Sequence, residues 1–210
     1  MKILNRKIIL AALVLVGVAV VGAAAASAQD VYKVNYFDFN APILAGFPVP
    51  DATVRIDNPG LTYGNLCAMI YVFAADQQMA ECCGCVETHN GLRRLSVRKD
   101  LTSNTLTGAV PGPGSSIFSG VIKVVSAAVN NSPCDPTANV TPKPNLRVWA
   151  THIQPGTAFG SFGGLIWPVT ETESSDSPLG ATELANLQAQ CAFISILGSG
   201  HGVCSCGTGD

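Results

Sequence analysis

Charged residues are scarce in this chain. Lys, Arg, Asp and Glu together make up 12% of its 210 residues, with 12 Lys and Arg against 14 Asp and Glu. Without a basic excess, there is no electrostatic case for nucleic acid or an anionic membrane surface as a partner. The low charge, combined with 21 Gly and 13 Pro, is typical of an extracellular β-rich domain rather than of a cytosolic helical enzyme.

Local signatures of catalysis and metal binding are also missing. The sequence has no Gly-x-Ser-x-Gly elbow, no His-Glu-x-x-His and no paired Cys-x-x-Cys zinc knuckles. Its one Cys-x-x-Cys spacing, Cys82 to Cys85, falls on a predicted strand, whereas thiol–disulfide catalysis favours a helix N-terminus. We therefore predict no catalytic, cofactor-binding or metal-binding residues and no cofactor. The missing local motifs do not exclude a catalytic triad assembled from residues distant in the chain.

One long apolar run is present, and it lies at the N-terminus. Three basic residues within the first seven positions precede an uncharged apolar stretch at 8–21, and Ala26-Ser27-Ala28 supplies the small residues of a cleavage site. We predict that residues 1–28 are a secretory signal peptide of bacterial type. The alternative is a retained membrane anchor. After cleavage, the chain is expected to be secreted, periplasmic or on the cell surface, with no membrane contact.

Cysteine is the one reactive residue type that the mature chain has in abundance. An even number of cysteines in an oxidising compartment predicts a disulfide framework, here of four bonds. The disulfide candidates are Cys67, Cys82, Cys83, Cys85, Cys134, Cys191, Cys204 and Cys206. The sequence does not choose among the roughly 105 possible pairings.

The stretch from Glu81 to Cys85 holds three of these cysteines within four positions. Strand alternation places its second and third cysteines on one face and its first on the other. The terminal pair, Cys204 and Cys206, shares a face in an extended chain, so the two pairs are predicted to meet. The helix carrying Cys191 and the C-terminal tail are then expected to lie against this strand.

The hydrophobic pattern predicts a mainly β fold. Runs of β-branched and aromatic residues between turn signals predict strands at 31–39, 52–57, 66–74, 79–87, 92–97, 120–128, 146–153 and 165–173. One helix is predicted at about 180–197 from apolar residues at helical spacing. Residues 29–210 are thus expected to form a single domain, a disulfide-stapled antiparallel β-sandwich of immunoglobulin-like outline with one C-terminal α-helix.

Several polar residues have both a functional and a structural interpretation. Glu81 and Glu87 share a strand face and could form a glycosidase-like pair, although solvated strand positions are the simpler interpretation. His89 lies in a predicted hairpin tip, His152 ends a strand, and His201 lies in a Gly-rich segment after the helix. A structural role is the simpler interpretation for each histidine.

Basic and aromatic residues gather in two places. The basic group is predicted to be a solvated edge that discourages strand pairing, and it comprises Arg93, Arg94, Arg98 and Lys99. The aromatic group could line a sugar- or peptide-binding surface, with core packing as the simpler interpretation, and it comprises Trp149, Phe159, Phe162 and Trp167.

These features favour an exported, non-catalytic binding or structural protein of the cell envelope or extracellular space, with a protein or a glycan as partner. The first alternative is an exported hydrolase acting on glycans or peptides through carboxylates or His152. The second is a metal- or redox-handling protein that uses the cluster from Cys82 to Cys85.

Overall fold

The computed structural model shows a mainly β protein with one C-terminal α-helix. It describes residues 30–38, 51–61, 64–111, 117–130, 134–138, 140–154, 158–159, 165–196 and 202–207. The predicted signal peptide, residues 1–28, lies outside these ranges, as does His201. Among the described residues, no helix has both the length and the apolarity needed to span a bilayer.

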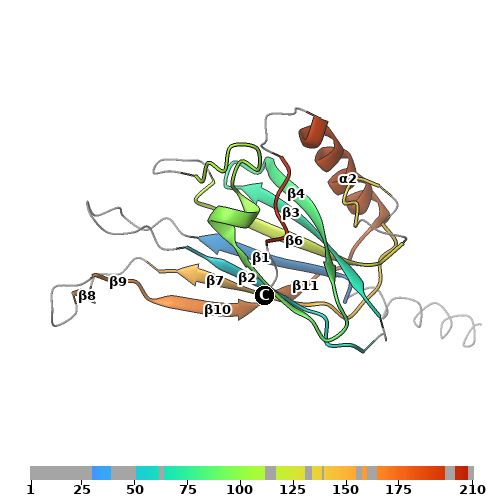
Figure 1. The fold of residues 1–210 in the computed structure, drawn as a ribbon, viewed down its shortest axis with the longest axis horizontal. Helices are drawn as coiled ribbons and strands as arrows, with labels where there is room; N and C mark the ends of the chain where they lie inside the picture. Colours follow the sequence, from blue (N-terminus) through green and yellow to red (C-terminus); the bar gives the residue numbers. More distant parts are fainter. Residues whose placement is uncertain are drawn as a thin grey trace, which may run out of the picture.

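Eleven strands follow one another in the described chain (Figure 1). They are β1 (Tyr32–Asp38), β2 (Thr53–Asp57), β3 (Leu66–Ala74), β4 (Met79–Glu87), β5 (Leu92–Ser96), β6 (Ser119–Ala128), β7 (Arg147–Ile153), β8 (Ala158–Phe159), β9 (Leu165–Ile166), β10 (Val169–Glu173) and β11 (Ser175–Asp176). A π-helical turn, η1 (Val97–Leu101), follows β5, and the helix is α2 (Ala181–Ile196). The predicted bounds of β3 and β4 are confirmed, whereas the predicted strand 165–173 is divided into β9 and β10.

Nine of these strands form one hydrogen-bonded sheet. Its order is β4-β3-β6-β1-β7-β2-β5, with β10 paired to β7 and β11 paired to β1. A single parallel pair, Asp38 with His152, joins β1 to β7. The sheet curls around its larger core, where side chains from β3, β4 and β6 meet those from β2, β5 and β7. The result is nearly barrel-like. The prediction of a mainly β fold with a C-terminal helix is therefore confirmed. The nine strands form one continuous sheet instead of the two facing sheets of a sandwich, and among the described residues β8 and β9 pair only with each other.

Strand β3 is buried on both faces, as its unbroken apolar run predicts. Ile70 points into the larger core, whereas Tyr71 belongs to a second core on the outer side of the sheet. Leu187 and Cys191 of α2 complete this second core. The helix therefore covers the outer face of the half that contains β3, β4 and β6 (Figure 1).

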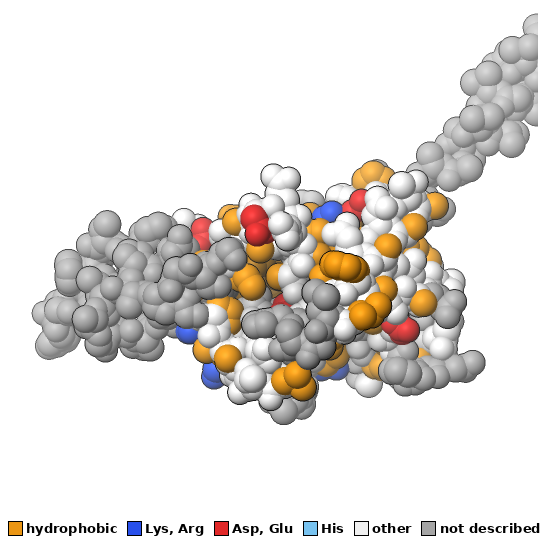
Figure 2. Space-filling model, turned by 90° about the horizontal axis from the view of Figure 1, so that it is seen from above, with side chains coloured by type: hydrophobic (Ala, Val, Ile, Leu, Met, Phe, Trp, Pro, Cys, Tyr) orange, Lys and Arg blue, Asp and Glu red, His pale blue; other side chains and the backbone are white. Residues whose placement is uncertain are grey.

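The surface on the α2 side is mixed in character. Seen from above, it carries hydrophobic side chains scattered among polar ones, with few charges (Figure 2). Phe193 and Ile196 are the exposed large hydrophobic residues of the helix. The view shows no concentration of one charge sign on this face, in keeping with the near balance of charge in the sequence.

Candidate functional site

The cysteines of β4 connect this strand to the helix and to the tail. Disulfides join Cys67 to Cys134, Cys82 to Cys191, Cys83 to Cys204 and Cys85 to Cys206. All eight cysteines are paired. The second and third cysteines of β4 point into the larger core and the first into the core beneath α2, as strand alternation predicts. The predicted disulfides are confirmed, and so is the position of the helix and tail against β4.

The tail also pairs with β4 through its backbone. Val203 forms an isolated parallel bridge with Cys82. The Cys82 N–H donates to the Gly202 carbonyl at 3.1 Å, and the Cys204 N–H donates to the Cys82 carbonyl at 3.1 Å. The tail thus adds a one-residue bridge to β4, the edge strand of the sheet, and satisfies both backbone groups of Cys82 at this edge.

Arg93 brings the two ends of the curled sheet together. Its Nε donates to Oε1 of Glu87 on β4 at 2.6 Å, and its Nη2 donates to the Val86 carbonyl at 2.9 Å. Nη1 also donates to the carbonyl of Cys206 in the tail. Burial raises the pKa of Glu87, and the guanidinium of Arg93 opposes that shift. The prediction that these two residues are solvated is wrong, because the curled sheet buries Glu87 and half-buries Arg93.

Glu81 lies on the same inward face and has no exposed surface. Burial raises its pKa to about 8, while a hydrogen bond from the Gly202 backbone opposes the shift. The side chain of Glu87 is only 2% exposed. A substrate cannot reach either carboxylate in this fold, so the geometry does not support a glycosidase-like pair.

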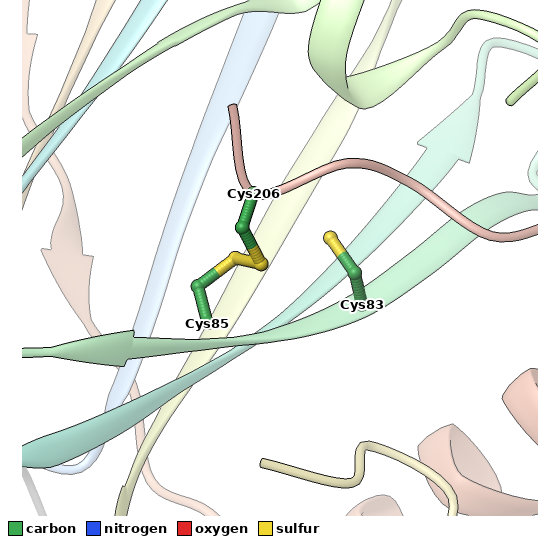
Figure 3. A group of neighbouring side chains, drawn as sticks. All are labelled: Cys83, Cys85 and Cys206. Atoms are coloured by element: carbon green, nitrogen blue, oxygen red, sulfur yellow. A yellow bond between two sulfur atoms is a disulfide. The ribbon is translucent and has the colours of Figure 1, made fainter. Parts of the chain in front are cut away.

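Three sulfur atoms of the cluster lie close enough to suggest a metal site. The Sγ atoms of Cys83, Cys85 and Cys206 lie within 4.8 Å of one another (Figure 3). Zinc and copper(I) bind cysteine as the thiolate. Here all three sulfurs are in disulfides, which carry no thiolate charge. In this oxidised form, the cluster is a cross-link between β4 and the tail.

His152 is buried, and polar side chains surround it that no sequence motif predicts. Its Nε2 lies 2.8 Å from the Thr172 hydroxyl, and its ring stacks on Tyr36 with centroids 3.8 Å apart. Burial lowers the pKa of His152, and the negative charge of Asp38 opposes that shift. Within the described part of the chain, Nδ1 has no hydrogen-bond partner. The sheet therefore brings a histidine, a hydroxyl and a carboxylate into one neighbourhood.

The other predicted site residues are dispersed. His89 and Arg94 are exposed, as predicted. The predicted hairpin at His89 is wrong, because β4 pairs with β3 and β5 pairs with β2. Trp167 is partly buried against the larger core, which agrees with core packing. The side chains of Phe159 and Phe162 lie outside the described residues.

Trp149 has a different environment from Trp167. It is half-buried on the outward face of β7, between Arg55 of β2 and Glu173 of β10. The Arg55 guanidinium reaches across β7, and its Nη1 lies 2.6 and 2.7 Å from the two carboxylate oxygens of Glu171. A hollow of about 360 Å³ lies here, lined by Arg55, Asp57, Leu92, Trp149 and Glu171. We call this surface of β5, β2, β7 and β10 the Trp149 face.

Comparison of the chain with protein-family models, with curated proteins and with solved structures finds no match. The functional assignment therefore depends on the residues and their geometry.

Proposed function

We propose that this chain is an exported, disulfide-cross-linked binding protein that acts without catalysis in the periplasm, on the cell surface or outside the cell. The observation that carries the proposal is the Trp149 face, where a half-buried indole lies beside the Arg55–Glu171 pair and a hollow. Small-molecule sites typically combine an apolar lining with a few fixed polar groups. Four disulfides cross-link the other half of the molecule, where they join β3 and β4 to a loop, to α2 and to the tail.

Export and the fold assignment belong to the same proposal. Oxidised cysteines suit an oxidising compartment, and the N-terminal pattern suits a signal peptide. We propose further that residues 29–210 form one domain of immunoglobulin-like sandwich type, supported by the core shared between the two halves of the curled sheet. N-terminal sequencing of the exported protein tests the first point, with Gln29 as the expected start.

Binding is tested with purified oxidised protein against a panel of soluble glycans and peptides. We expect at least one probe to bind wild type and to lose affinity in Trp149→Ala. The matched control is Phe193→Ala, which removes an exposed aromatic side chain from α2, on the other half of the molecule. If no probe depends on Trp149, the proposed function fails.

An exported hydrolase is the second candidate, and His152 is the observation that favours it. A histidine nitrogen at hydrogen-bond distance from a hydroxyl is the geometry in which a base activates a nucleophile. In this arrangement, Thr172 would be the nucleophile and His152 the base, near Asp38. Turnover of chromogenic ester and glycoside substrates that disappears in both His152→Ala and Thr172→Val would replace the binding proposal.

A further inference from the structure

We infer that the Trp149 face recognises a neutral, hydroxyl-rich saccharide. The inference rests on the proposed function and names the class of ligand. It is carried by the placement of the indole, by the charges around it and by the position of the hollow on the sheet.

The indole of Trp149 provides an apolar surface between two neighbouring strands. Its cross-strand neighbours, Arg55 on one side and Glu173 on the other, belong to strands that pair directly with β7. The ring is half-buried, so part of it is open to solvent. An aromatic ring of this kind can pack against the apolar C–H face of a sugar ring while polar groups at its border bind the hydroxyls.

Charge on the face is balanced. Strand registers and alternation place six charged side chains on the outward side, namely Arg55, Arg94, Arg147, Asp57, Glu171 and Glu173. Three are basic and three are acidic, so the surface offers no net complement to a polycation or a polyanion. A neutral ligand is therefore favoured over a charged one.

The same side chains suit hydroxyl groups. Arginine has only donors and a carboxylate only acceptors, whereas a hydroxyl both donates and accepts. Nη1 of Arg55 donates to both carboxylate oxygens of Glu171, and this ion pair orients the two groups beside Trp149 before any ligand arrives. Such preorganisation reduces the entropy that binding would otherwise lose.

The position of the hollow separates a saccharide from a peptide. Extended peptides commonly bind by adding to a strand edge through backbone hydrogen bonds. The hollow of about 360 Å³ instead lies on the flat of the sheet, where side chains make the contacts. Its lining residues come from β5, β2, β7 and β10, so one ligand would touch four strands.

The chain has only two tryptophans, and this allows a direct experiment. In full-length oxidised Trp167→Phe, the fluorescence reports Trp149 alone. The neutral probes are a soluble β-glucan, a xylan, a galactomannan and chitin oligosaccharides. The comparison probes are heparin, polylysine and a mixed peptide panel. Affinity electrophoresis in gels containing each soluble polysaccharide gives a second readout.

We expect at least one neutral glycan to change the Trp149 fluorescence and to retard the protein in the gel. Trp149→Ala should weaken this binding by roughly tenfold or more, Trp149→Phe should retain part of it, and Phe193→Ala should leave it unchanged. An unaltered near-UV spectrum outside the tryptophan bands and the absence of free thiols show that each variant is folded.

Three outcomes overturn the inference. Peptide binding that depends on Trp149, with no neutral glycan bound, would remove the saccharide assignment and leave the binding function in place. Preference for heparin or polylysine would contradict the charge argument; it would remove the neutral-saccharide assignment and leave the binding function in place. If neither glycan nor peptide binding depends on Trp149, the inference and the proposed function both fail.

Discussion

Replacing Glu81 with Gln should make the protein more stable than wild type at alkaline pH. The carboxyl is fully buried, and burial raises its pKa to about 8 from an ordinary value of 4.5. Between these two values, the folded state keeps a proton that the unfolded chain has lost. The stabilising effect of that proton is therefore complete below about pH 4.5 and disappears as the pH rises through 8.

The size of the effect follows from the difference between the two pKa values. At about 1.4 kcal/mol per pH unit, the decline in the free energy of unfolding reaches at most roughly 5 kcal/mol by pH 8. This figure is an upper limit because water that enters beside an ionised Glu81 lowers the cost of burying the charge. The Gln amide has a similar shape and no proton to lose, so this decline is absent from the variant.

Urea unfolding of both proteins at pH 5, 6, 7, 8 and 9, with the disulfides intact, measures the effect. The quantity to follow at each pH is the free energy of unfolding of the variant minus that of wild type. Titration of Glu87 and of the histidines occurs in both proteins and cancels to first order. We expect this difference to increase in favour of Glu81→Gln up to about pH 8 and then to level off. A difference that stays constant from pH 5 to 9 would show that Glu81 is not held protonated by burial.

Two further substitutions test the packing around β4, each with a matched control. Gly84→Ala places a Cβ 2.0 Å from the carbonyl oxygen of Cys134 and should destabilise the fold by roughly 1–3 kcal/mol in thermal unfolding. Gly64→Ala, with no atom within 4 Å of its Cβ, should change stability by less than about 0.5 kcal/mol. Arg93→Ala leaves a buried β4 carboxylate without its cation and should cost on the order of 3–5 kcal/mol, whereas exposed Arg94→Ala should cost less than about 0.5 kcal/mol. Equal losses of stability in Gly84→Ala and Gly64→Ala would contradict the close packing of Gly84 on Cys134. Equal losses in Arg93→Ala and Arg94→Ala would contradict the buried ion pair with Glu87.

The local features of the fold were predictable from the sequence because they depend on neighbours in the chain. The apolar run at 66–74 and the turn signal after it indicate the hairpin of β3 and β4. The Asn-Gly signal after β4 marks a turn but not the predicted hairpin, because β5 pairs with β2 instead of β4. Period-two alternation was enough to place Cys83 and Cys85 opposite the terminal Cys-x-Cys pair. The approximate helix bounds followed from apolar residues at helical spacing.

The contacts that close the sheet were not predictable, because they depend on how the strands pair and curl in space. Arg93 and Glu87 are near one another in the chain and looked like solvated strand residues, but their strands lie at opposite ends of the sheet order, and the curl of the sheet encloses their ion pair. His152 meets Thr172 through the pairing of β7 with β10, and neither segment has a motif that indicates it. The sequence also does not show which of the four aromatic residues in the predicted binding surface faces solvent. Trp149 is identified as an outward residue only by the pairing of β7 with β2 and β10.

Disulfide mapping is the most direct test of the central claim, that β4 is the junction holding the helix and the tail. The exported protein is digested without reduction, and the linked peptides are sequenced by electron-transfer fragmentation, because three of the cysteines lie within four residues. We predict Cys82 linked to Cys191, with the other two cysteines of β4 each linked to one cysteine of the tail, and no free thiol. A bond from Cys82 to the tail, or a free thiol at Cys191, would contradict this arrangement.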